Sequence, residues 1–99
     1  MAAYVISEVE AILDQAAMER YRALASRSIA AFGGRYLVRG GEAATVEGAP
    51  PAGMIIVVEF PSMARAREWY ASAAYAEALK ERRTALERRL IFVEGVPPA

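Results

Sequence analysis

Histidine and cysteine are both absent from the 99 residues, which restricts the chemistry that the chain could carry out. Without histidine the sequence lacks the commonest general base and transition-metal ligand, and without cysteine it can form no disulfide or thiolate nucleophile. The acidic residues lack the spacing of a metal-binding loop, and no glycine-rich phosphate-binding motif follows a strand and opens a helix. We therefore expect neither a metal nor a cofactor, and any reaction would depend on carboxylates, tyrosines, arginines or the single lysine.

Arg39 and Glu59 are the first candidates for ligand binding. Arg39 ends a predicted strand beside Gly40-Gly41, where glycine permits close backbone approach, so the arginine could clamp a carboxylate. Glu59 ends an apolar strand, and a buried carboxylate has a raised pKa and can serve as a base, since it holds an abstracted proton more tightly. The alternatives are a solvent-facing strand end for Arg39 and a cross-strand ion pair of Glu59 with Arg35 or Arg39.

Tyr75 and Arg83 are the other two candidates, and both lie in the second helical region. Tyr75 follows a break at Ser72, so its hydroxyl could meet a ligand at the mouth of a cleft or could simply reach water from a packed ring. Arg83 could point into the same cleft. It also belongs to a basic stretch, from Arg82 to Arg89, that is interleaved with glutamates. Mixed signs at helical spacing usually mean a solvated face, which argues against a nucleic-acid partner.

The elements that would position these residues follow from the apolar periodicity and from the glycines and prolines. An apolar stripe at three- and four-residue steps predicts a helix that Asp14 caps and Gly33-Gly34 ends. A second helical region runs from about residue 62 to residue 88 in two pieces, with Ser72 between them. Short runs rich in β-branched and aromatic residues predict four strands, at residues 4–9, 35–39, 54–60 and 90–94.

This β-α-β-β-α-β order predicts an α+β, ferredoxin-like sandwich over residues 1–99, with an antiparallel four-stranded sheet and the helices on one face. Trp69 and Tyr70 lie on the apolar side of their helix and are expected in the core. The strand at 54–60 is apolar on both faces, and residues 90–93 repeat this pattern. Because the helices can cover only one face, we expect a second copy to cover the other in a side-by-side homodimer. The alternative is a monomer whose loop folds over the sheet.

Charge and hydropathy set the remaining limits. Twelve basic residues balance twelve acidic ones, and the net charge of zero gives no field that would attract nucleic acid or an anionic membrane. The longest apolar run, Met54 to Val58, is too short to cross a bilayer, and the N-terminal residues lack the basic segment of a signal peptide. We therefore expect a single cytoplasmic domain without membrane or nucleic-acid partners.

Several segments resemble a bacterial family of small uncharacterised domains known as DUF1330, within the dimeric α+β barrel superfamily. They are Gly33-Gly34-Arg35-Tyr36-Leu37-Val38-Arg39-Gly40-Gly41, Glu59-Phe60-Pro61-Ser62, Trp69-Tyr70-Ala71-Ser72 with Tyr75, and Val93-Glu94-Gly95. The chain departs from the family where it has Asp14-Gln15 in place of Asp-Pro and Ser72-Ala73-Ala74-Tyr75 in place of Ser-Pro-Glu-Tyr. The resemblance implies the ferredoxin-like fold and the dimer, but it supplies no reaction, since the superfamily holds monooxygenases, isomerases, haem enzymes and ligand sensors.

Two functions are consistent with the sequence. The first is a small-molecule-binding domain, in which Arg39, Glu59, Tyr75 and Arg83 would serve a ligand or a cofactor-independent reaction on a carboxylate- or enol-bearing substrate. The second is a non-catalytic dimeric module that senses a ligand or accompanies another protein. The absence of histidine favours the second and disfavours metal or histidine-ligated haem chemistry.

Overall fold

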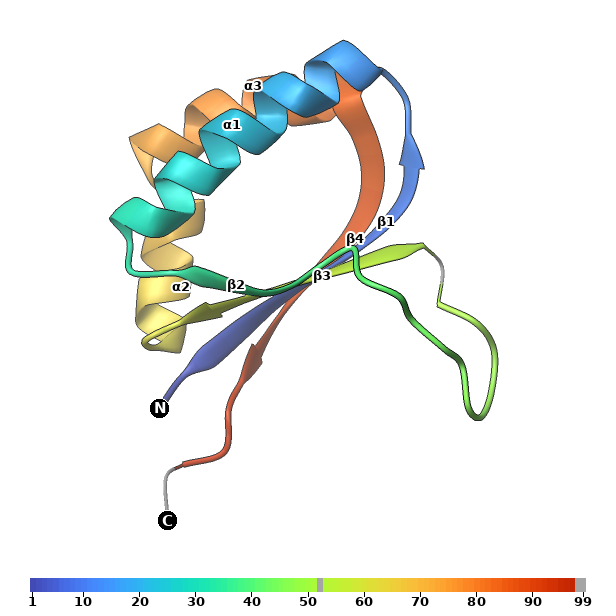
Figure 1. The fold of residues 1–99 in the computed structure, drawn as a ribbon. Coiled ribbons are helices and arrows are strands. Elements are labelled where there is room, and N and C mark those ends of the chain that lie inside the picture. Colours follow the sequence, from blue (N-terminus) through green and yellow to red (C-terminus); the bar gives the residue numbers. More distant parts are fainter. Residues whose placement is uncertain (52, 98–99) are drawn as a thin grey trace.

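The computed structural model describes residues 1–51 and 53–97 and shows a curved sheet with helices packed on one face (Figure 1). The strands lie in the order β2-β3-β1-β4, and each neighbouring pair is antiparallel. This arrangement confirms the predicted α+β, ferredoxin-like fold. In chain order the elements are β1 (Ala3–Ile12), α1 (Gln15–Ala31), β2 (Arg35–Arg39), β3 (Met54–Phe60), α2 (Met63–Tyr70), α3 (Ala73–Ala85) and β4 (Leu86–Glu94).

The first and last strands are longer than the sequence predicts. β1 continues to Ile12, and β4 begins at Leu86 directly after α3 rather than at residue 90. The two strands pair along their whole length, from Ala3 opposite Glu94 to Ile12 opposite Leu86, with an irregularity after Val9. Residues 86–89 are Leu-Glu-Arg-Arg, a mostly charged stretch of good helix formers that resembles the end of a helix, but pairing with β1 overrides that local preference.

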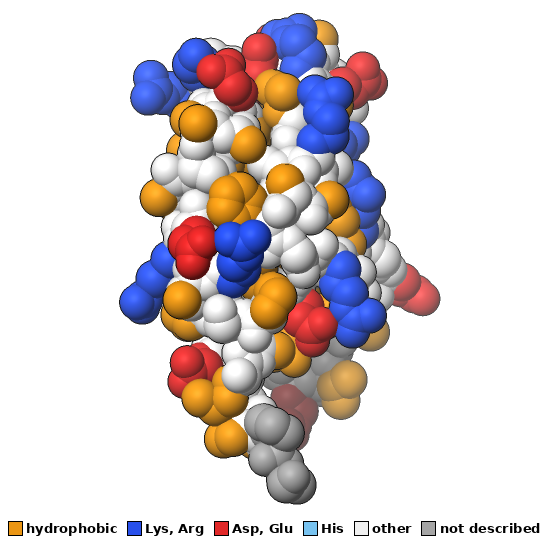
Figure 2. Space-filling view, turned by 90° about the vertical axis from the view of Figure 1, so that its left-hand side faces the viewer, with side chains coloured by type: hydrophobic (Ala, Val, Ile, Leu, Met, Phe, Trp, Pro, Cys, Tyr) orange, Lys and Arg blue, Asp and Glu red, His pale blue; other side chains and the backbone are white. Residues whose placement is uncertain are grey.

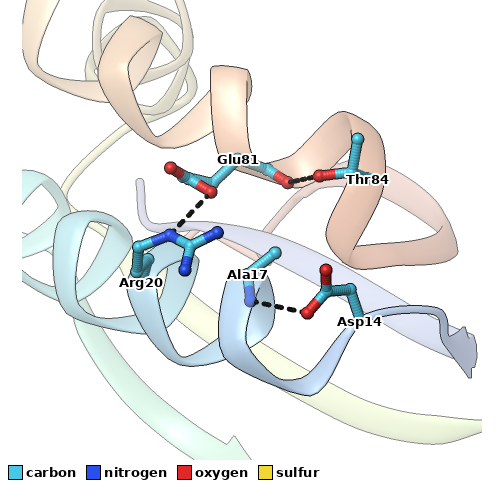
Figure 3. A network of polar contacts seen from close by, with 5 residues as sticks. All are labelled: Asp14, Ala17, Arg20, Glu81 and Thr84. Carbon is cyan, nitrogen blue, oxygen red and sulfur yellow. Dashed lines mark hydrogen bonds and ion pairs between the residues drawn. The ribbon is translucent and has the colours of Figure 1, made fainter.

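Each helix starts at a side-chain cap. The carboxylate of Asp14 accepts a hydrogen bond from the Ala17 backbone N–H at 3.1 Å, and Ser62 and Ser72 cap α2 and α3 in the same way. Between the helices, Arg20 of α1 donates to Glu81 of α3 at 3.1 Å (Figure 3). The caps therefore fix where the helices start, and the ion pair is an exposed contact between α1 and α3.

The core lies between the helices and the helix-facing side of the sheet. Its largest fully buried side chains are those of Met18, Phe60, Trp69 and Tyr75. The indole Nε1 of Trp69 donates to the Ser28 hydroxyl at 3.0 Å, which in turn donates to a backbone carbonyl of α1. Trp69 is therefore a core residue as predicted, whereas the neighbouring Tyr70 is 42% exposed, with its ring centre 6.0 Å from that of Phe92 on β4.

The other face of the sheet carries no helix (Figure 1). Ile6 of β1 lies opposite Val57 of β3 on one side and Ile91 of β4 on the other, so a half-buried apolar row crosses three strands. Two ion pairs border this row, Arg35–Glu59 at 2.9 Å and Glu8–Arg89 at 2.6 Å. We call this surface, made by Ile6, Ile55, Val57, Ile91 and the two ion pairs, the open face. Residues 40–51, in the loop between β2 and β3, are all exposed, so that loop does not fold over it.

The outer surface at the α1–α2 end mixes basic, acidic and apolar side chains (Figure 2). On this side of the molecule the two signs of charge are interspersed. Within the described ranges, no helix is long and apolar enough to span a membrane.

Candidate functional site

A cavity of about 260 Å³ lies between α1 and the helix-facing side of the sheet. This is close to the lower end of the size range of small-molecule sites. Most of its wall is apolar, and the principal apolar side chains are those of Val5, Val9, Met18, Ile29, Ile56 and Val58. The strand alternation explains this, because the register places every second residue of β1 and β3 under the helices.

At one end of the cavity, three side chains from three different elements form a closed hydrogen-bond network. The hydroxyls of Tyr21 on α1 and Tyr75 on α3 lie 2.8 Å apart. The guanidinium of Arg88 on β4 donates from Nη1 to the Tyr21 oxygen at 2.7 Å and from Nη2 to the Tyr75 oxygen at 2.6 Å. We call these three residues the Tyr–Tyr–Arg cluster. Tyr21 and Arg88 line the cavity, and the fully buried Tyr75 lies behind them.

Burial controls the protonation of this cluster. It raises the pKa of the Tyr21 phenol well above the ordinary value, an effect that the neighbouring Tyr75 reinforces and that Arg88 only partly offsets. For Arg88, burial alone would lower the pKa, but the two phenol oxygens outweigh this and the pKa is raised. At neutral pH the cluster therefore holds a guanidinium cation beside the neutral phenol of Tyr21.

Two buried polar atoms at the cavity have no hydrogen-bond partner among the described residues: the Ser7 hydroxyl oxygen and the Arg88 Nε. An unpaired buried donor is unfavourable by about 1–3 kcal/mol, and more for a charged group. Ser28 shows the usual solution, since its buried hydroxyl both accepts from Trp69 and donates to the Ala25 carbonyl. Ser7 and Arg88 both line the cavity, and neither of these two atoms has an acceptor among the described residues.

The charged residues that line the cavity in the described part of the chain are three arginines, Arg22, Arg39 and Arg88, and no carboxylate accompanies them. Arg39 donates from Nη2 to the Ser26 hydroxyl at 3.0 Å, and its guanidinium carbon lies 4.2 Å from the centre of the Tyr36 ring. The register explains its direction, because Arg39 is opposite Ile56, which also lines the cavity. The cavity is therefore electropositive and suited to an anion.

The other predicted site residues are placed differently. Glu59 lies on the open face, where it pairs with Arg35, so the cross-strand alternative describes its contact. The Tyr75 hydroxyl meets neither a cleft mouth nor water, but contacts Tyr21 and Arg88. Arg83 does not line the cavity but a second hollow of about 310 Å³, which is more open than the cavity and is also lined by Tyr70, Leu79 and Arg82. Arg88 and Leu90 line both the hollow and the cavity.

Four of the residues discussed at the site were not predicted: Ser7, Tyr21, Arg22 and Arg88. Ser7 could have been found, because it interrupts the inward-facing apolar series Ala3, Val5 and Val9 with a hydroxyl. Tyr21 looked like an ordinary member of the apolar stripe of its helix. Arg88 was assigned to a solvated helical face, and only its place in β4 directs it beneath the helices.

The chain matches the family described as "Domain of unknown function (DUF1330)" over residues 2–96, which confirms the resemblance. Among solved structures, it is similar to RPA0582, a protein of unknown function from Rhodopseudomonas palustris, with 21% identity, a TM-score of 0.74 and coverage of 98% of this chain and 84% of the other. A dimeric protein of unknown function and ferredoxin-like fold from Bacteroides fragilis NCTC 9343 gives 10% identity, a TM-score of 0.62 and coverage of 95% and 96%. These likenesses establish the fold. None of the curated proteins compared with the chain matches it.

Proposed function

The chain belongs to the DUF1330 family, and we propose that it binds a small carboxylate- or enol-bearing molecule in the cavity between α1 and the sheet. The observation that carries this proposal is the pair of unpartnered buried groups, Arg88 Nε and the Ser7 hydroxyl, at the wall of that cavity. A ligand oxygen would give both groups the acceptor that they lack.

The rest of the cavity supports a ligand with one anionic end and an apolar body. The three lining arginines favour negative charge, and Val5, Met18 and Ile56 offer surface to a hydrocarbon portion. The volume suits a small organic acid rather than a nucleotide or a lipid chain. Arg39 is thus retained as a ligand-binding candidate at this cavity, whereas Glu59 belongs to the open face on the other side of the sheet.

The same geometry serves two classes of function. As an enzyme, the chain would stabilise an enolate through Arg88 without any cofactor. As a non-catalytic sensor or accessory module, it would bind the anion, and α1, which covers the cavity, would transmit the effect of binding. The second class is favoured by the lack of a free carboxylate base at the cavity wall in the described ranges, since proton abstraction needs an acceptor close to the ligand.

We also propose that two copies associate through their open faces. The apolar row of Ile6, Val57 and Ile91 would then be covered, and the flanking ion pairs would lie at the rim. A two-fold arrangement of this kind places each cavity on the outer side of the dimer, beneath its own helices, so that ligand binding and association use opposite faces of one sheet.

The experiment that tests ligand binding is a thermal-shift and calorimetric comparison of three carboxylates with amines of similar shape. Benzoate, phenylacetate and 4-methylpentanoate are compared with benzylamine, phenethylamine and isopentylamine. We expect at least one carboxylate to raise the melting temperature and to bind measurably, and none of the amines to do so, because the cavity is lined by arginines. Equal effects of acids and amines, or no binding of any acid, would overturn the proposal.

A further inference from the structure

The Tyr–Tyr–Arg cluster contains more hydrogens than its internal contacts use. Arg88 can only donate, so each phenol oxygen accepts one hydrogen bond from the guanidinium. The contact between the two hydroxyls uses the hydrogen of one phenol and leaves the hydrogen of the other without an acceptor in the cluster. One of the two tyrosines therefore has a free donor.

Burial decides which tyrosine this is. Tyr75 is 0% exposed, and among the described residues its hydroxyl contacts Tyr21 and Arg88 only. A hydrogen left free on Tyr75 would be a buried donor with no acceptor, which is unfavourable. Tyr21, in contrast, lines the cavity. The hydrogen on Tyr75 is thus directed to the Tyr21 oxygen, and the hydrogen on Tyr21 is left for the cavity.

We propose that the Tyr21 hydroxyl is a third donor to the bound ligand, beside Arg88 Nε and the Ser7 hydroxyl, and that the site therefore selects an acceptor-only oxygen group, a carboxylate or enolate, over an amide of the same shape. This inference rests on the proposed function and adds the residue and the selectivity to it. Burial, which raises the pKa of Tyr21, keeps the phenol in its donating form throughout the neutral range. The NH₂ of a primary amide would meet the Arg88 Nε, which can only donate, and would find at most the Ser7 oxygen as an acceptor.

The test uses whichever of benzoate, phenylacetate and 4-methylpentanoate binds the wild-type chain most tightly, together with its primary amide. We expect the acid to bind at least about tenfold more tightly than the amide, and Tyr21→Phe to weaken binding of the acid by about tenfold or more, the effect of one hydrogen bond to a charged acceptor. Tyr36→Phe is the matched control, because Tyr36 lines the same cavity but its hydroxyl contacts Ser26 at 3.3 Å. This control should change the affinity by less than about threefold, which is less than the loss of one net hydrogen bond to the ligand would cause.

The outcomes separate the inference from the proposed function. If the acid binds the wild-type chain but Tyr21→Phe binds it equally well, Tyr21 is not a ligand donor and the inference fails, while anion binding in the cavity stands. If no acid binds, the proposed function itself fails.

A second measurement applies if Tyr21→Phe does not fold. Replacing Tyr21 with 3,5-difluorotyrosine keeps the ring and gives a more acidic phenol. Binding of the acid should then begin to weaken at a lower pH than it does in the wild-type chain, since the ionised phenol cannot donate. Binding that depends on pH in the same way in both chains would overturn the inference.

Discussion

Arg88 lies directly opposite Val9 in the antiparallel pair of β4 with β1, and Val9 faces the helices. This register directs the guanidinium beneath α1 and α3, where it meets the hydroxyls of Tyr21 and Tyr75. Had residues 86–89 continued α3, the same arginine would have pointed to solvent. The site therefore depends on the abrupt change from α3 to β4 at Leu86.

Ser7 and Ser28 are both buried serines, and they should respond in opposite ways to replacement by alanine. Ser7→Ala removes a hydroxyl without a partner, so we expect the free energy of unfolding to stay equal or to rise by up to about 1 kcal/mol. Ser28→Ala leaves the Trp69 Nε1 without its acceptor and should lower stability by about 1–3 kcal/mol. Urea denaturation of the two variants measures both effects.

The affinity for the ligand should be affected by the other of the two substitutions. Ser7→Ala should weaken carboxylate binding, whereas Ser28→Ala should leave it unchanged at temperatures where the variant is folded. A Ser7→Ala variant that is destabilised and binds normally would show that Ser7 has a structural role, and it would remove the main support for the site.

The cluster also predicts a stability change at alkaline pH. Because the pKa of Tyr21 is raised in the folded chain, the folded state holds its proton more tightly than the unfolded state does. This contribution is fully present below the unfolded pKa of about 10, and it is lost as the pH rises from there towards the folded pKa. Unfolding free energies measured at increasing pH should therefore fall above about pH 10, and the fall should be smaller in Tyr21→Phe.

Glu59 offers a test of the separation between the two faces of the sheet. Its ion pair with Arg35 is partly exposed, so Glu59→Gln should change stability by no more than about 1 kcal/mol. Carboxylate binding should be unaffected, because Glu59 and the cavity lie on opposite faces. Calorimetry with the acid that binds the wild-type chain most tightly measures this, and a marked loss of affinity would place Glu59 at the ligand.

The sequence was sufficient for the fold because strand and helix patterns are local properties. The two apolar faces of β3 and the caps at Asp14, Ser62 and Ser72 are visible as residue types at fixed spacing. The site depends instead on register, which brings Ser7, Tyr21 and Arg88 together from positions up to 81 residues apart. Arg39 was predictable because the glycine pair beside it marks a strand end, whereas nothing local distinguishes Arg88 from its exposed neighbour Arg89.

The open face gives the last prediction, which concerns association. Val57 and Val58 are neighbours in β3, but Val57 belongs to the open face and Val58 is buried under the helices. If two copies pair through the open face, light scattering behind a sizing column should report about twice the 10.7 kDa mass of one chain.

Val57→Lys would then place two like charges at a two-fold interface and should give a folded monomer. Val58→Lys should prevent folding, since an unpaired buried charge is unfavourable by several kcal/mol, comparable with the whole stability of a small domain. Circular dichroism separates these two results. A wild-type chain that runs as a monomer, or a Val57→Lys variant that stays dimeric, would show that this face is not where the copies meet.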